Sequence, residues 1–165
     1  LALSRDRGEA VMGSDFCHPM LRVAARKWTQ SPLVEADALR LPIRDGSLDL
    51  ITVAFGFRNF VDYEAGLREM RRVMRRGGMV AILEFSRPPN PVFRKIYEAY
   101  SGRVLPWVGG LISGSRDAYE YLPESVKKFP GAEELAGMMS EAGFNDVRFV
   151  RMTLGVVAVH TGRVL

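Results

Sequence analysis

The sequence predicts an α/β fold with a mostly parallel sheet that is closed by an antiparallel carboxyl-terminal hairpin. Residues 48–55 and 79–85 are apolar runs, and an amphipathic segment joins them. A strand, a helix and a second strand in this order predict a right-handed parallel βαβ unit. Two further apolar runs near the end of the chain, 147–153 and 156–161, flank Gly155 and predict the hairpin.

The elements that precede the βαβ unit are short. Residues 10–14 are apolar or small and predict a buried strand, and residues 33–36 predict a second short strand. Between them, residues 18–28 carry apolar side chains at helical spacing and predict a helix. An Asp-Gly-Ser turn at 45–47 then leads into the strand at 48–55.

The helix of the βαβ unit and the helices after it follow from periodicity and from helix-breaking residues. Residues 63–76 place apolar side chains on one face, and we expect this helix to stop at Gly77 and Gly78. Residues 92–105 carry an apolar stripe that ends at Pro106. Two further helical segments are predicted at 115–129 and 133–142.

The chain predicts one domain, residues 1–165, that begins inside its fold. Residues 1–8 resemble the last turns of a helix that a glycine ends, and a strand follows at once. A doubly wound sheet that binds a nucleotide cofactor needs a first strand and a Gly-rich turn. Since neither precedes residues 10–14, we expect at least one strand–helix unit, about 30 residues, to be missing.

Composition and charge limit the classes of function. Hydrophobic residues make up 47% and charged residues 25% of the 165 residues, as in an ordinary globular domain. The net charge of +4 comes from dispersed arginines, so nucleic-acid binding is not predicted. The single cysteine, Cys17, excludes an intrachain disulfide and suits a reducing, cytoplasmic location. No group of His and Cys residues has the spacing of a metal site, and no metal is predicted.

Two aspartates each follow a predicted strand. Asp15 follows the strand at 10–14, and Asp37 follows the strand at 33–36. A carboxylate at the carboxyl end of a strand in an open α/β sheet can accept hydrogen bonds from ribose hydroxyls or from an exocyclic amine. Aspartate also caps helices and turns, which is the structural alternative. The residues alone leave both interpretations open.

Three more polar residues are candidates for chemistry. Arg58 and Glu84 each lie near the end of a strand of the βαβ unit. A guanidinium stays charged and can stabilise an anion, while a carboxylate beside it can act on a ligand or hold the arginine. For Arg58 the structural alternative is a surface ion pair with Asp62 or Glu64. The third candidate, His160, lies in the last predicted strand, where it can act as a base or occupy a packed core position.

Several separated motifs resemble those of the ubiquinone/menaquinone biosynthesis C-methyltransferases, a family that uses S-adenosylmethionine. The resemblance covers the chain from Gly13 to Gly162. Arg75 and Arg76 depart from the family's usual Lys-Pro pair, and Ala54 stands where some members carry a serine that contacts the cofactor. The matching motifs are G-S-D-F-C-H-P-M-L at 13–21, D-A-L-R-L-P at 37–42, F-G-F-R-N at 55–59, E-F-S at 84–86 and A-Y-E-Y-L-P-E-S-V-K-K-F-P at 118–130.

The resemblance implies a Rossmann-like class I methyltransferase fold that here lacks its first strand and Gly-rich loop. It implies S-adenosylmethionine as the cofactor and methyl transfer to a ring carbon of a prenylated quinol, either demethylmenaquinol or a polyprenyl-methoxy-benzoquinol. The residues expected to act are Arg58, Glu84 and His160 in catalysis, and Asp15, Phe16, Asp37, Ala38 and Phe55 in cofactor binding.

Residues 87–130 are predicted to be an insertion that forms a lid on the substrate side. Their large apolar side chains suit a prenyl tail, and packing on the protein's own sheet is the alternative. A peripheral contact with the inner face of the membrane and a homodimer are left open. The residues expected to contact the quinol are Tyr97, Tyr100, Trp107, Tyr119 and Tyr121.

Two other functions are left open by the sequence. One is a methyltransferase-like protein that binds quinones or other subunits without catalysis. The other is a methyltransferase for another small phenol, against which the aromatic insertion argues.

Overall fold

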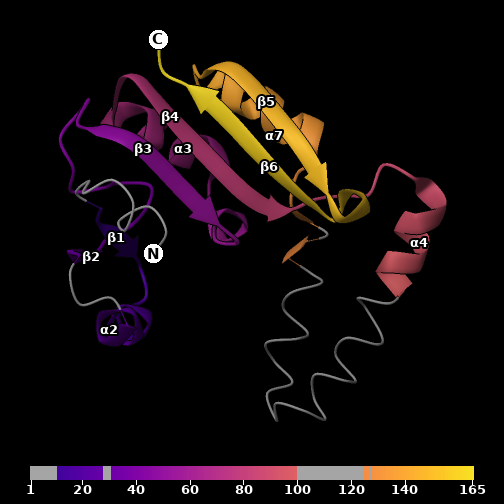
Figure 1. Ribbon diagram of the computed structural model, residues 1–165, viewed down its shortest axis with the longest axis horizontal. Helices are drawn as coiled ribbons and strands as arrows, with labels where there is room; N and C mark the ends of the chain where they lie inside the picture. Colours follow the sequence, from indigo (N-terminus) through magenta and orange to yellow (C-terminus); the bar gives the residue numbers. More distant parts are fainter. Residues whose placement is uncertain (1–10, 28–30, 100–124, 127) are drawn as a thin grey trace.

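The computed structural model describes residues 11–27, 31–99, 125–126 and 128–165 (Figure 1). Its strands form a parallel pair, β1-β2, and a four-stranded sheet in the order β3-β4-β6-β5. β3 pairs parallel with β4, while β6 runs antiparallel to both β4 and β5. The predicted α/β fold with parallel strands and an antiparallel hairpin is confirmed.

The strands are β1 (Gly13–Asp15), β2 (Leu33–Glu35), β3 (Leu48–Ala54), β4 (Met74–Phe85), β5 (Asn145–Met152) and β6 (Val157–Arg163). The helices are α2 (His18–Lys27), α3 (Tyr63–Val73), α4 (Pro91–Ala99) and α7 (Ala132–Glu141), with short 3-10 turns η1 (Phe57–Asn59) and η3 (Thr153–Gly155).

The first two strands form a sheet of their own. Gly13 lies opposite Leu33 and Asp15 opposite Glu35, and α2 packs against both strands. A single sheet was expected, but in the described residues β1 and β2 share no ladder with β3.

The βαβ unit differs from the prediction at its glycines. α3 ends at Val73, earlier than predicted, because Met74 is already extended with φ −83° and ψ 138°. Both glycines lie inside β4, where Gly77 has a φ of +80°. A Cβ on Gly78 would lie 2.9 Å from the carbonyl oxygen of Arg75. The glycine pair therefore forms a tight turn within β4, which a larger residue could not make.

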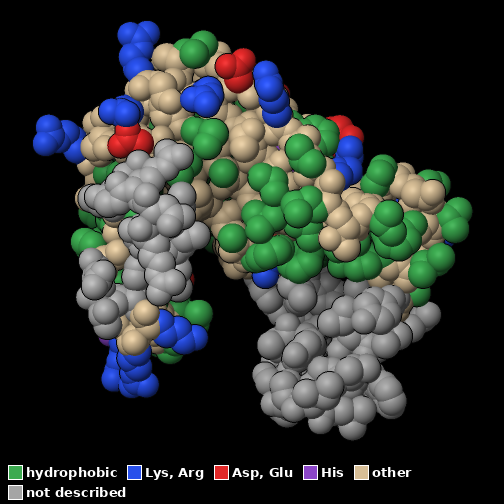
Figure 2. All heavy atoms as spheres, viewed as in Figure 1, with side chains coloured by type: hydrophobic (Ala, Val, Ile, Leu, Met, Phe, Trp, Pro, Cys, Tyr) green, Lys and Arg blue, Asp and Glu red, His purple; other side chains and the backbone are tan. Residues whose placement is uncertain are grey.

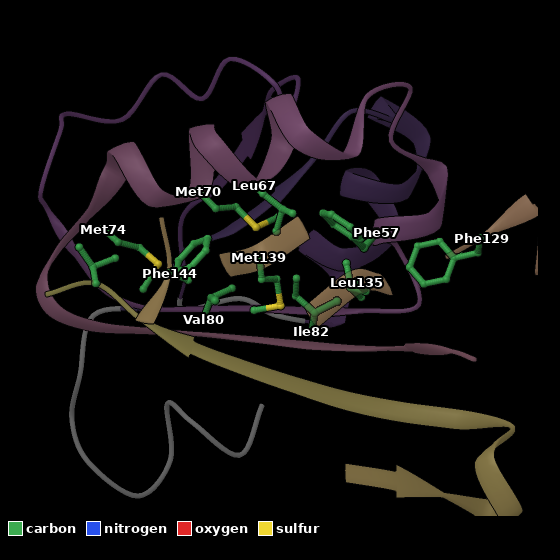
Figure 3. Close-up of a cluster of buried hydrophobic side chains, with 11 residues drawn as sticks. Phe57, Leu67, Met70, Met74, Val80, Ile82, Phe129, Leu135, Met139 and Phe144 are labelled. Atoms are coloured by element: carbon green, nitrogen blue, oxygen red, sulfur yellow. The ribbon is translucent and has the colours of Figure 1, made fainter. Parts of the chain in front are cut away.

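The hydrophobic core lies between one face of the four-stranded sheet and the helices α3 and α7 (Figure 3). Val80 and Ile82 alternate along β4, point to this side and have no exposed surface. Leu67 from α3 and Leu135 from α7 are also fully buried, and burying each such side chain contributes about 1.5–3 kcal/mol. Phe57 of η1 is buried in the same cluster, so the segment after β3 is anchored to the core.

The other face of this sheet carries exposed apolar side chains. Val150 and Met152 of β5 are 66% and 50% exposed. In the view of Figure 1 the helices α3 and α7 lie behind the sheet, and Figure 2 shows hydrophobic side chains gathered on the face in front. Among the described residues, none of the helices is both long enough and apolar enough to cross a bilayer.

Candidate active site

An arginine and a glutamate meet where β3 and β4 end. Nη1 of Arg58 donates to Oε1 and Oε2 of Glu84 at 3.0 and 3.2 Å. The backbone N–H of Arg58 also donates to Oε2 at 3.2 Å. The two side chains are only 11% and 1% exposed. Because removing charges from water is costly unless they are paired, each side chain fixes the position of the other.

Asp62 and Glu64, the surface carboxylates that were alternative partners of Arg58, make their contacts within α3 instead. Asp62 caps this helix, since its Oδ1 accepts from the backbone N–H of Ala65 at 2.8 Å. Glu64 pairs with Arg68 one turn along the helix at 3.3 Å. The carboxylate that holds Arg58 is therefore the buried one on the neighbouring strand.

Phe55 sits beside this pair in a left-handed backbone conformation, with a φ of 55°. Its N–H donates to the carbonyl oxygen of Leu83 at 2.9 Å, and its own carbonyl oxygen accepts from Nη1 of Arg58. The rings of Phe55 and Phe85 lie 5.0 Å apart, and the guanidinium carbon of Arg58 lies 5.4 Å from the centre of the Phe85 ring. Such a backbone is rare for an aromatic residue and is concentrated at functional sites.

Two buried polar atoms near the end of β4 have no hydrogen-bond partner in the described part of the chain. They are Nε of Arg58 and Oγ of Ser86. Ser86 is 3% exposed, and its backbone N–H donates to the carbonyl oxygen of Val156 at 2.8 Å. Nε of Arg151 and Nδ1 of His160 are also buried without a partner in the described chain, so these two atoms alone do not define a ligand site.

The two aspartates predicted to bind the cofactor lie at the carboxyl ends of the small sheet, Asp15 as the last residue of β1 and Asp37 two residues after β2. The backbone N–H of Ala36 donates to the carbonyl oxygen of Asp15 at 3.1 Å, which joins the ends of β1 and β2. Oδ1 of Asp15 accepts from the N–H of Cys17, and Oδ1 of Asp37 accepts from the N–H of Leu39, at 2.8 and 2.9 Å. Each side chain therefore closes a local turn, and Asp15 lies three residues before α2 begins at His18, so it does not cap that helix. Each exposed carboxylate keeps its second oxygen without a partner among the described residues, so each can still accept from a ligand.

His160 lies in β6 beneath the first turn of α7. It is 2% exposed, its ring lies 5.3 Å from that of Phe149, and Nε2 hydrogen-bonds the carbonyl oxygen of Ala132 at 2.9 Å. Burial lowers the pKa of His160 below its ordinary value, so the ring is neutral near pH 7. None of its hydrogen bonds within the described chain reaches Arg58 or Glu84, and this geometry favours the packed core interpretation.

The other predicted contacts are only partly described. Phe16 is 77% exposed beside Asp15, and Ala38 is half-buried after Asp37. Tyr97 is half-buried on α4. The other predicted quinol contacts lie outside the described residues; they are Tyr100, Trp107, Tyr119 and Tyr121. The sequence reasoning placed Ser86 with Glu84 at the ligand-binding edge of the sheet but assigned it no role of its own.

Comparison with known proteins assigns the chain to a family. Residues 2–164 match the model of the ubiE/COQ5 methyltransferase family. The chain belongs to this family. It is 51% identical over 162 residues to the demethylmenaquinone methyltransferase of Thermus thermophilus, and this match covers 96% of the chain and 73% of that protein. It is 44% identical over 163 residues to the ubiquinone/menaquinone biosynthesis C-methyltransferase UbiE of Shewanella frigidimarina, covering 95% of the chain and 64% of that protein.

Solved structures of low sequence identity share the fold. A SAM-dependent methyltransferase from Aquifex aeolicus matches with a TM-score of 0.65 at 16% identity, over 97% of this chain and 71% of that one. The [4+2]-cyclase SpnF matches with a TM-score of 0.72 at 15% identity, over 99% of this chain and 70% of that one. The predicted fold of the SAM-dependent methyltransferases is confirmed. The family expectation from the motifs is confirmed as well.

Proposed function

We propose that the protein containing this chain transfers a methyl group from S-adenosylmethionine to a ring carbon of a prenylated quinol. The observation that carries the proposal is the family match over residues 2–164, together with 51% identity to a demethylmenaquinone methyltransferase. The names of the relatives support demethylmenaquinol as substrate, or a polyprenyl-methoxy-benzoquinol where ubiquinone is made.

The residues at the ends of β1 and β2 suit the nucleoside part of the cofactor. When bound, S-adenosylmethionine supplies an electrophilic methyl group on a sulfonium sulfur. The free oxygen of Asp15 would accept from a ribose hydroxyl, and that of Asp37 from the exocyclic amine of the purine. Phe16 offers an exposed aromatic face, and the small side chain of Ala38 leaves room for a ring.

We assign the catalytic role to Arg58. In the transfer, the quinol ring carbon forms a bond to the methyl carbon as the carbon–sulfur bond breaks, and the ring carbon then loses its proton. The ring is a better nucleophile when the adjacent hydroxyl has lost its proton. The side-chain hydrogen bonds of Arg58 within the described chain all come from Nη1, so Nη2 can donate to the resulting phenolate and stabilise it. Phe55, which is 39% exposed, would line the same position.

Glu84 and His160 were predicted as catalytic residues, and those roles stay predictions. Both oxygens of Glu84 already accept from Arg58, and Oε1 also accepts from the N–H of Phe85 at 2.8 Å. His160 is bonded to the carbonyl oxygen of Ala132. The geometry therefore supports positioning of Arg58 by Glu84 and packing of α7 by His160.

The quinol's apolar tail would lie against the insertion at 87–130. In its described part, α4 carries Tyr97 half-buried and Val92 and Ile96 exposed at 67% and 61%. This amphipathic helix, which also carries Arg94 and Lys95, supports the predicted lid and a peripheral contact with the inner, cytoplasmic face of the membrane. A homodimer stays a prediction.

The test is methyl transfer by the full-length protein, with isotopically labelled S-adenosylmethionine and the two prenylated quinols. We expect the label at a ring carbon, detected by mass spectrometry and NMR. Asp15→Asn and Asp37→Asn keep the capping oxygen but lose the charge, so they should weaken cofactor binding. Asp49→Asn, which removes the charge from a surface partner of Arg75, is the matched control. Label on a hydroxyl oxygen, or no transfer to either quinol by a protein that binds the cofactor, would refute the proposal.

A further inference from the structure

Arg72, in the last turn of α3, uses all of its N–H donors. Nε and Nη2 donate to the two oxygens of Glu69 at 2.8 and 2.6 Å. Nη1 donates to the carbonyl oxygen of Ile43 at 3.0 Å and to the carboxylate of Asp45. Nη2 donates to the carbonyl oxygen of Leu41 at 3.1 Å. A guanidinium carries five N–H donors in a fixed plane, and here each has an acceptor.

Leu41 is thereby held on both sides of its backbone. Its N–H donates to Oε1 of Glu69 at 2.6 Å, and its carbonyl oxygen accepts from Arg72. Glu69 and Arg72 therefore bond the backbone N–H and the carbonyl oxygen of Leu41, the two groups that a neighbouring β-strand would bond in a sheet. The hydrogen bond from Arg72 is the main reason that the pKa of Glu69 lies below its ordinary value, so the pair stays charged at neutral pH.

A single tight turn connects this anchor to Asp37. The N–H of Arg40 donates to the carbonyl oxygen of Asp37 at 2.9 Å, and Leu39 donates to its side chain. Leu39 in turn lies over α3, since a Cβ on Gly66 would come within 3.4 Å of its side chain. The whole segment from Asp37 to Leu41 is therefore fixed to α3, a helix that contributes to the core.

We propose that Glu69 and Arg72 are positioning residues that set the affinity for the cofactor by holding the turn 37–41 against α3. This inference rests on the proposed function, because it takes Asp37 and Ala38 as contacts of the nucleoside. A turn that is fixed before binding loses less conformational freedom when the ligand arrives. Since a lysine has one nitrogen and no planar fork, it cannot replace the contacts of Arg72 with two carboxylates and two carbonyl groups.

The experiment uses Arg72→Lys and Glu69→Gln in the full-length protein. Arg68→Lys and Glu64→Gln are matched controls, because they change an exposed pair of the same residue types on the same helix. The measurements are calorimetric affinity for S-adenosylmethionine, KM for cofactor and quinol, kcat, thermal unfolding, and hydrogen exchange of the Leu41 amide without ligand. If Arg72→Lys does not fold, Asp45→Ala removes the outermost partner of Arg72 and carries the test with Glu69→Gln.

We expect Arg72→Lys to weaken cofactor affinity about tenfold and to speed exchange of the Leu41 amide, with kcat and the quinol KM unchanged. The control variants should match the wild type in all measurements. Faster exchange with unchanged cofactor affinity would overturn the inference, since the pair would then be a purely structural clamp. A folded wild-type protein that binds no S-adenosylmethionine would instead overturn the proposed function and the inference with it.

Discussion

The chain contains two arginine–glutamate pairs that differ in origin and in the structure. Glu69 and Arg72 lie one turn apart on α3, whereas Arg58 and Glu84 come from separate elements. In the pair of Arg72 and Glu69 every guanidinium N–H has a protein acceptor, although the arginine side chain is 34% exposed. In the pair of Arg58 and Glu84 the arginine is 11% exposed, yet its Nε has no partner among the described residues. The exposed arginine is thus saturated with hydrogen bonds, and the buried one is not.

This difference separates a structural arginine from a candidate catalytic one. When every N–H of a guanidinium is already hydrogen-bonded to the protein, no donor is free for a ligand, so Arg72 can only hold the backbone. An unsaturated guanidinium in a buried site carries an unmet hydrogen-bonding capacity. Arg58 therefore has donors available for an anion that forms during a reaction, while Glu84 fixes where they lie.

The largest expected effect is on turnover. Arg58→Ala should lower kcat about a hundredfold, because it removes the donor that stabilises the developing phenolate, and cofactor affinity should stay near that of the wild type. Steady-state kinetics and calorimetry on the full-length protein measure the two quantities. Arg76→Ala, at an exposed arginine, is the control. If Arg58→Ala weakened cofactor binding as much as turnover, Arg58 would belong with Arg72 as a positioning residue.

The next effect is on stability and compares the two glutamates. Glu84→Gln removes the charge partner of a nearly buried arginine, so we expect the free energy of unfolding to fall by about 3 kcal/mol. Glu69→Gln acts on a pair whose arginine is partly exposed and has other acceptors, and we expect about 1 kcal/mol. Denaturant unfolding of both variants provides the measurement. Equal losses would show that burial does not distinguish the two pairs.

The smallest effect concerns pH and a third buried polar group. Because burial lowers the pKa of His160, the unfolded chain takes up a proton near pH 6.5 that the folded protein does not. The stabilising contribution of the neutral ring is therefore complete above that pH and is lost as the pH falls below it. His160→Gln keeps a donor for the Ala132 carbonyl and should make stability less sensitive between pH 7 and 5. His18→Gln, at the exposed histidine, is the control, and identical pH profiles for wild type and His160→Gln would contradict the prediction.

Local patterns were enough to predict the elements that carry the site. The apolar runs at 48–55 and 79–85 and the paired runs around Gly155 correspond to β3, the main part of β4, and the β5-β6 hairpin. These succeed because alternation, chain breaks and turn residues act over a few positions. The position of Arg58 past β3 was also readable, since the strand end and the motif coincide.

Other features depend on parts of the chain that are distant in sequence. The helix predicted at 63–76 ends early because Met74 pairs with Leu48 of β3, a contact that helical periodicity does not contain. Arg72 resembled one more cation at the end of a helix. Its role depends on the carbonyl oxygens of Leu41 and Ile43, which reach it only after the chain has folded back. The same holds for Glu84, whose partner lies on the neighbouring strand connection.

The left-handed backbone at Phe55 restricts which amino acids this position can accept. Valine, isoleucine and threonine are strained in that conformation, while glycine and asparagine adopt it readily but would leave no aromatic ring beside Phe85. Backbone geometry and the ring contact therefore select for different residues. An evolving protein that kept this turn would have few neutral substitutions available at position 55, whatever quinol it acts on.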